Sequence, residues 1–177
     1  MRAIISCIER LRIKLDRHRK DGIKEYPTRI IFIHPLLQAL GWDVRDPDEA
    51  ELEYPTIDGK SVDYALKINR KPVLFIEAKP LNDPLTDVKS ITQVVSYAAN
   101  AGVEWCILTN GVTYKVYRST EKAEAPDKLF LKFLSIQRKL RVCQSNKSRT
   151  FLHACHVMQW RKVYLTRLVN KSSLQQR

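Results

Sequence analysis

The chain has 177 residues, of which 44% are hydrophobic and 28% charged, and its formal net charge is +12. A chain of this size and composition can bury one full hydrophobic core, so we expect one folded domain with an appendage. It has no run of about 18 apolar residues, and Glu9 and Arg10 interrupt the apolar N-terminal stretch, which argues against a membrane span and a secretory leader. We therefore expect a cytoplasmic protein.

The excess of positive charge lies at one end of the sequence. Residues 137–177 hold ten Lys or Arg and no acidic residue, which leaves 21 basic and 19 acidic residues in the first 136. We therefore divide the chain into an N-terminal amphipathic helix in residues 1–22, a main domain in residues 23–136 and a basic tail in residues 137–177. The tail is expected to be partly disordered or helical, with a helix at 151–169 as one option. It either holds nucleic-acid phosphates in a salt-dependent manner or has no partner.

Two helices are predicted at the N-terminal end. The first covers residues 3–18 and is amphipathic. The second begins near Glu25, whose acidic side chain suits a first helical turn, and stops at Gly41; Pro35 is expected to kink or divide it. The apolar stripes are Ile4, Ile5, Ile8, Leu11 and Leu15 in the first helix and Ile30, Ile33, Leu37 and Leu40 in the second.

The middle of the sequence predicts five strands and one further helix. Short polar connections between the first three strands imply antiparallel neighbours, and the helix that follows is long enough for a right-handed parallel crossover. Asn110–Gly111 predicts a type I′ turn between the last two strands. The expected fold is α/β, a mixed central sheet of about five strands flanked by helices in the order α-α-β-β-β-α-β-β. The predicted segments are strands at 51–57, 61–68, 72–79, 103–109 and 112–118 and a helix at 86–101.

Charged residues interrupt two neighbouring strands. Asp63 lies near the start of one strand and Glu77 near the end of its antiparallel partner, so the two carboxylates are expected to meet. Oxygen ligands of this kind, with the carbonyl of Ala78 as a further ligand, suit Mg²⁺ or Mn²⁺. Lys79, on the same face as Glu77, could orient or deprotonate a metal-bound water or stabilise charge on a phosphate. The pattern favours metal-assisted phosphodiester hydrolysis, with a solvated hairpin face as the alternative.

Several motifs carry a resemblance to a known family. Asp63, thirteen intervening residues and Glu77-Ala78-Lys79 resemble the D-(x)n-E-x-K signature of the PD-(D/E)XK nuclease superfamily. The segments YPTRIIFIHPLLQALGWDV, VDYAL, PVLFIEAKPL and WCILTNGVTYKVYR follow in the order found in the N-terminal nuclease domain of type I restriction enzyme R subunits, which they resemble.

The resemblance implies a restriction-endonuclease-like fold in residues 23–136 and Mg²⁺-dependent DNA cleavage. It gives metal binding to Asp63 and Glu77, assistance of the attacking water to Lys79, and an assisting role to Glu25 in the preceding helix. Helix-dipole stabilisation is the alternative for Glu25. The family's Q-xxx-Y pair, which steers the DNA backbone or the catalytic lysine, corresponds to Gln93 and Tyr97; the alternative is that they are helix-surface neighbours.

Other features narrow the function. The sequence has no G-x-x-x-x-G-K-[ST] loop, so we expect that the chain alone does not translocate DNA. The expected partners are DNA and a separate motor or specificity subunit, with a homodimer as a further option and no membrane. The four cysteines lack CxxC spacing, which suits reduced thiols, and we do not assign zinc to His153, Cys155 and His156. The competing function is a catalytically silent DNA-binding or assembly module.

Overall fold

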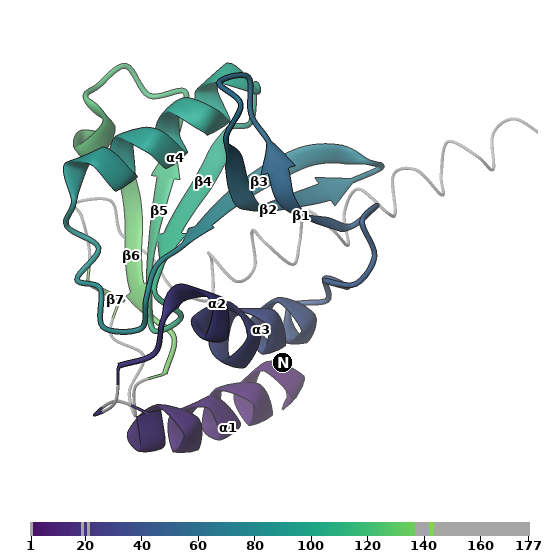
Figure 1. The fold of residues 1–177 in the computed structure, drawn as a ribbon, viewed down its shortest axis with the longest axis vertical. Coiled ribbons are helices and arrows are strands. Elements are labelled where there is room, and N and C mark those ends of the chain that lie inside the picture. Colours follow the sequence, from purple (N-terminus) through teal and green to yellow (C-terminus); the bar gives the residue numbers. More distant parts are fainter. Residues whose placement is uncertain (1, 19, 21, 137–141, 144–177) are drawn as a thin grey trace, which may run out of the picture.

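The computed structural model describes residues 2–18, 20, 22–136 and 142–143. Most of the basic tail, including the predicted helix at 151–169 and the histidines considered for zinc, lies outside these residues. Within them, helices precede a mixed sheet and one helix lies among the strands, as predicted (Figure 1). The elements are α1 (Arg2–His18), α2 (Glu25–Thr28), the π-helical segment η1 (Arg29–Ile33), α3 (His34–Ala39), β1 (Ala50–Pro55), β2 (Ser61–Ile68), β3 (Lys71–Ala78), α4 (Val88–Asn100), β4 (Trp105–Thr109), β5 (Thr113–Arg118), the 3₁₀ segment η2 (Ala125–Lys128), β6 (Leu129–Leu134) and β7 (Val142–Cys143).

Within the described residues the sheet has seven strands in the order β1 to β7, two more than expected. Among the described strands only β3 and β4 run parallel, and α4 makes the crossover between them, as the sequence predicted. All other neighbouring strands are antiparallel. The two additional strands were missed because β6 follows a charged connection without a Gly-containing turn signal, and β7 is too short to show periodicity.

The hairpin turns differ from the expectation. Asn69 and Arg70, between β2 and β3, have φ values of 52° and 64°, and two consecutive positive φ values are the signature of a type I′ turn. The type I′ prediction for Asn110–Gly111 is wrong, because Gly111 has a positive φ and Asn110 does not. Instead the Asn110 side-chain carbonyl accepts hydrogen bonds from the backbone N–H groups of Val112 and Thr113 and stabilises a three-residue connection.

One helical segment runs from Glu25 to Ala39 in three parts. The His34 N–H donates to the carbonyl of Arg29, five residues back, which is the hydrogen bond of a π turn. Pro35 lies in the first turn of α3, where a missing N–H costs least, so the prediction that it divides the helix is confirmed.

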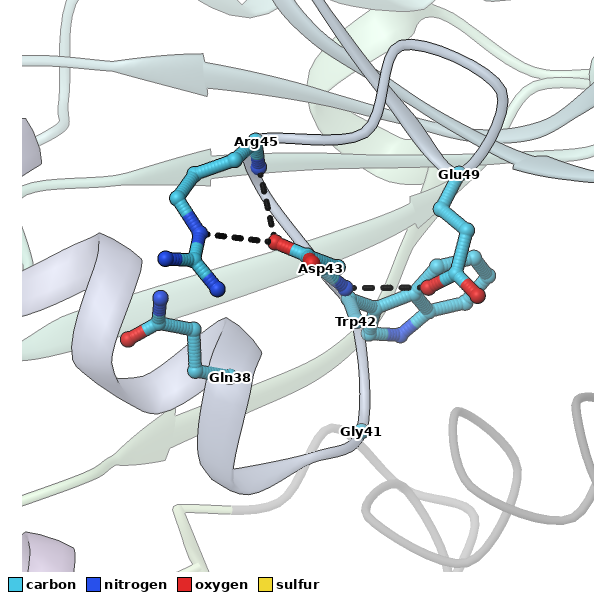
Figure 2. A pocket seen from close by; sticks show the side chains of 6 residues that line it. All are labelled: Gln38, Gly41, Trp42, Asp43, Arg45 and Glu49. Carbon is cyan, nitrogen blue, oxygen red and sulfur yellow. Dashed lines mark hydrogen bonds and ion pairs between the residues drawn. The ribbon is translucent and has the colours of Figure 1, made fainter.

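The helix stops at Gly41, also as predicted. Gly41, with φ 95°, donates to Gln38 O, and Trp42 donates to Leu37 O, which is a Schellman motif. The loop that follows forms a pocket of about 400 Å³, in which Arg45 pairs with Asp43 (Figure 2). The pocket is lined by Gln38, Gly41, Trp42, Asp43, Arg45 and Glu49.

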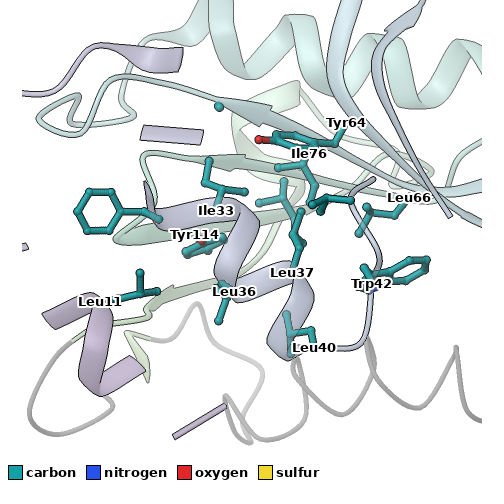
Figure 3. Packing of buried hydrophobic residues seen from close by; sticks show 14 of the residues in the cluster. Leu11, Ile33, Leu36, Leu37, Leu40, Trp42, Tyr64, Leu66, Ile76 and Tyr114 are labelled. Carbon is teal, nitrogen blue, oxygen red and sulfur yellow. The ribbon is translucent and has the colours of Figure 1, made fainter. Parts of the chain in front are cut away.

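Each face of the sheet carries its own hydrophobic core. Helices α1 to α3 cover one face, and their apolar side chains pack with Tyr64, Leu66 and Ile76 of the sheet (Figure 3). Helix α4 covers the other face and packs on Phe75 and its neighbours. Strands buried on both faces have few exposed alternate positions, which explains the nearly continuous apolar run in β3.

Helix α1 packs with the same core as the sheet. Its buried stripe is Ile4, Cys7, Leu11 and Leu15, whereas Ile5, which the sequence placed in the stripe, is 53% exposed. Cys7 and Cys106 are buried free thiols, and the Cys7 thiol donates to the Pro35 carbonyl. None of the helices in the described ranges is long and apolar enough to cross a membrane.

Substitution by alanine should destabilise the fold more at Gly111 than at Gly102. A Cβ at Gly111 would lie 2.7 Å from the Cβ of Phe32, and Gly102, at a similar positive φ of 67°, has open space around it. Both Gly→Ala variants share the cost of a left-handed backbone, but only Gly111→Ala also forces η1 off the sheet. We expect Gly111→Ala to lower the free energy of unfolding by about 1–3 kcal/mol more than Gly102→Ala. Urea denaturation measures both; equal losses would contradict the close packing.

Candidate active site

The structure places Asp63 and Glu77 beside each other on neighbouring strands. In the antiparallel pair of β2 and β3, Tyr64 lies opposite Ile76, and continuing the register by one residue sets Asp63 opposite Glu77. The backbone N–H of Ala78 donates to Asp63 Oδ2 over 2.6 Å. Both residues are buried, with 7% of each exposed. Two acidic groups therefore lie side by side where water screens them poorly.

Lys79 neutralises one of these carboxylates. Its Nζ donates to Glu77 Oε1 over 2.9 Å. Burial acts to lower the pKa of Lys79, but the charge of Glu77 and the hydrogen bond to it outweigh burial and raise that pKa above its ordinary value. Without a metal, Lys79 is therefore a protonated donor and not a base.

Glu77 and Glu25 are both harder to ionise than ordinary glutamates. Burial, followed by the negative charge of Asp63, raises the pKa of Glu77 to about 7 in spite of its pairing with Lys79. Burial and the charge of Asp63 also raise the pKa of Glu25, which begins α2. The structure therefore brings Glu25, Asp63, Glu77 and Lys79 within electrostatic reach of one another.

Arg29 belongs to the same cluster and was missed by the sequence analysis. Its Nη1 contacts Asp63 Oδ1 at 2.8 Å and also a carboxylate oxygen of Glu53, while its Nε donates to the Tyr64 hydroxyl. Burial acts to lower the pKa of Arg29, but the hydrogen bond to Glu53 and the charge of Asp63 raise it, so the guanidinium stays charged. One signal in the sequence could have revealed it: Arg29 falls on the apolar stripe that continues with Ile33, where a charge needs a buried partner.

Gln93 and Tyr97 lie on α4, which covers the opposite face of the sheet from α1 to α3. Gln93 is half-buried and Tyr97 is buried in the core cluster that contains Phe75. Among the described residues, no hydrogen bond or ion pair joins either side chain to Asp63, Glu77 or Lys79. The Tyr97 hydroxyl is buried and has no hydrogen-bond partner within the part of the chain that the structure describes. Their role in substrate binding stays a prediction.

The donor set of the cluster fits a divalent cation in charge and in chemistry. When all groups are ionised, the carboxylates of Glu25, Glu53, Asp63 and Glu77 exceed the cations of Arg29 and Lys79 by two charges. Mg²⁺ is commonly held by only one or two carboxylates, with water and substrate phosphates completing the shell. The described residues contain no group of three or more His, Cys, Asp or Glu side chains arranged to hold a metal ion. The residues that could hold a cation are Asp63 and Glu77, as two carboxylate ligands, with the backbone carbonyl of Ala78 as a further ligand.

The pocket beyond α3 lies elsewhere and contains none of the predicted site residues (Figure 2). Its polar groups bond one another, since the Asp43 N–H donates to Glu49 and its carboxylate accepts from Arg45. Those bonds stabilise the loop between α3 and β1. The candidate active site is therefore the group of buried charges at β2 and β3.

Comparison with known families supports a nuclease-type domain. Residues 50–125 match the family model for the type I restriction enzyme R protein N terminus, the nuclease region of these enzymes. This part of the chain is a domain of that family. It contains Asp63, Glu77, Lys79, Gln93 and Tyr97, whereas Glu25 and Arg29 precede it. Searches of curated proteins and of solved structures returned no match.

The pKa of Glu77 makes a stability difference that depends on pH. The folded chain keeps a proton on Glu77 up to about pH 7, whereas the ordinary value is 4.5, so this group's contribution to stability falls as the pH rises between these values. Glutamine does not ionise, so the stability of Glu77→Gln lacks this decrease. In the absence of divalent cations, we expect the free energy of unfolding of Glu77→Gln, relative to that of the native chain, to increase by about 1–3 kcal/mol as the pH is raised from 4.5 to 8.

Urea denaturation at several pH values measures this difference. Glu121→Gln, which removes an exposed carboxylate, is the control and should follow the native chain. A Glu77→Gln difference that is constant with pH would contradict the raised pKa.

Proposed function

We propose that the chain is a divalent-metal-dependent DNA endonuclease of restriction type with a restriction-endonuclease-like fold. The observation that carries the proposal is the proximity of Asp63 on β2, bonded to the Ala78 N–H of β3, to the Glu77–Lys79 ion pair at the end of β3, inside the segment that matches the R-protein family. In this proposal, Asp63 and Glu77 hold Mg²⁺ or Mn²⁺, with the carbonyl of Ala78 as a further ligand. The proposed partners are DNA and a separate motor or specificity subunit, and the proposed location is the cytoplasm.

The chain's own residues would divide the work of hydrolysis. A bound divalent cation activates water and stabilises negative charge on the phosphate. Lys79 is protonated and its Nζ lies on Glu77, so it is placed to donate a hydrogen bond to the attacking water or to a phosphate oxygen. Glu25, whose pKa is raised, is a stronger base than an ordinary glutamate when it is ionised and is the candidate proton acceptor. The burial of Asp63 and Glu77 and the partial burial of Glu25 and Lys79 strengthen the electrostatic interactions among these groups.

Cleavage of supercoiled plasmid tests the proposal. We expect nicking or linearisation with Mg²⁺ and none with EDTA, and a loss of roughly 10²- to 10⁴-fold in Asp63→Asn and Lys79→Ala. Asp63→Asn is chosen because an amide oxygen can still accept the hydrogen bond from the Ala78 N–H. Asp58→Asn and Lys60→Ala, in the exposed turn before β2, change the same residue types outside the cluster and should cut normally.

The second candidate function is a catalytically silent DNA-binding module, and one observation favours it. Both carboxylate oxygens of Asp63 already have partners, Arg29 and the Ala78 N–H, as in a structural ion pair. A silent DNA-binding module would bind DNA in a salt-dependent manner and leave the plasmid intact at every metal concentration. That outcome, from folded protein, would overturn the nuclease proposal.

Tyr97 allows a separate test of substrate binding. Because its hydroxyl is buried without a hydrogen-bond partner among the described residues, Tyr97→Phe should leave the free energy of unfolding unchanged or slightly higher. If the hydroxyl acts on DNA or on Lys79, cleavage should fall by roughly 3- to 10-fold, the worth of about one hydrogen bond. Tyr117→Phe, in the same core cluster, is the control. Unchanged cleavage in Tyr97→Phe would leave Tyr97 a packing residue only.

A further inference from the structure

We propose that Glu53 sets the affinity of Asp63 for a divalent cation by sharing the positive charge of Arg29, so that the guanidinium keeps a partner when a cation takes Asp63 Oδ1. Glu53 is thus a positioning residue that acts through Arg29. The inference rests on the metal site of the proposed function, and it concerns two residues outside the D-(x)n-E-x-K signature.

Strand register places Glu53 directly beside Asp63. In the antiparallel pair of β1 and β2, Leu52 lies opposite Tyr64 and Tyr54 opposite Val62, so Glu53 falls opposite Asp63. Together with Glu77 on β3, three carboxylates lie in one row across three strands. Like charges directly opposite each other destabilise a sheet, so this row requires cations.

Arg29 is the cation shared within this row. One nitrogen, Nη1, contacts both Asp63 Oδ1 and a carboxylate oxygen of Glu53. The rest of the guanidinium is held in place, because Nε donates to the Tyr64 hydroxyl and the Tyr64 ring centroid lies 5.0 Å from Cζ. Arg29 therefore stays buried and has two alternative anionic partners within short reach.

The two partners differ in exposure. The Asp63 side chain is 9% exposed and the Glu53 side chain 58% exposed. Asp63 faces the other buried charges, whereas Glu53 stands at the outer side of Arg29. A cation that takes Asp63 Oδ1 repels Arg29, and Glu53 is the partner that can keep the guanidinium paired without blocking that oxygen.

The backbone at Glu53 is bent to make this contact. Glu53 has φ 51°, and it is the only non-glycine residue within a described strand that has a positive φ. This conformation costs roughly 1–2 kcal/mol for a residue with a Cβ. It directs the carboxylate to Arg29 and to the Ser61 hydroxyl, which donates to it over 3.0 Å.

Removal of Glu53 should therefore weaken metal binding through Arg29. Without Glu53, Asp63 is the sole ion-pair partner of Arg29 among the described residues, and a metal must displace a buried arginine from its carboxylate. The charge of Glu53 could also attract a cation directly, so the decisive variant keeps the charge and loses the contact. Glu53→Asp does so, because the shorter side chain no longer reaches Nη1.

Calorimetric titration of the full chain with Mn²⁺ tests the inference. We expect Glu53→Gln and Glu53→Asp each to weaken Mn²⁺ binding about tenfold, a coupling typical of residues in one ion-pair network. Glu51→Gln is the matched control, since it removes a carboxylate from the same strand that pairs with Lys67 instead, and it should bind Mn²⁺ as the native chain does. Thermal unfolding of each variant establishes that it is folded.

Asp63→Asn in the same titration separates the two proposals. If Asp63→Asn binds Mn²⁺ like the native chain, the metal site of the proposed function is wrong and this inference falls with it. If Asp63→Asn loses binding but Glu53→Asp does not weaken it, the metal site stands and the role of Glu53 is overturned. A loss in Glu53→Gln alone would assign Glu53 a direct electrostatic effect and would also overturn the inference.

Discussion

The buried carboxylate of Asp63 is the point on which the two halves of the structure depend. One oxygen accepts from Arg29 in the N-terminal helical segment and the other from the backbone N–H of Ala78 in β3. A buried charge is tolerated only when it is paired and hydrogen-bonded, so Asp63 requires both partners. The same side chain therefore links the helical segment to the sheet and β2 to β3.

The helical segment that carries Arg29 contains a π turn and packs closely on the sheet. The π turn begins at Arg29 and ends where Pro35 would have interrupted an α-helix. It also lets the segment approach the sheet closely, since Phe32 packs against Gly111 in the connection between β4 and β5. Ser135 holds that connection from the other side by donating to the Gly111 carbonyl. The lack of a side chain at Gly111 thus contributes to the placement of Arg29.

Much of the fold could be predicted from the sequence because the signals were local. Apolar periodicity gave α1 and α4, and β-type runs with short polar connections gave β1 to β5. The stop at Gly41 followed from the need for a left-handed residue after a helix. The turn type at Asn110 did not follow, because its side chain bonds the backbone of the connection in a way that a dipeptide signal does not show.

The site was predictable only in part, for a physical reason. Asp63, Glu77 and Lys79 lie on one hairpin, where alternation and register bring them together within a few residues of sequence. Arg29 and Glu53 come from other elements, and their meeting depends on how a helix docks on a strand. Glu53 gave no signal in the sequence, because its left-handed conformation is usual for glycine and not for glutamate.

The charges of the hairpin residues Asp63, Glu77 and Lys79 form one cluster with those of Arg29 and Glu53. The family match begins at residue 50 and therefore includes Glu53, Asp63 and Glu77, but it excludes Arg29. Within the matched segment alone, Lys79 would face three neighbouring carboxylates across β1 to β3. The arginine that offsets them comes from the helical segment before the matched residues and pairs with both Glu53 and Asp63. The cluster of buried charges therefore extends beyond the matched segment and includes Glu25 and Arg29 of the helical segment before it.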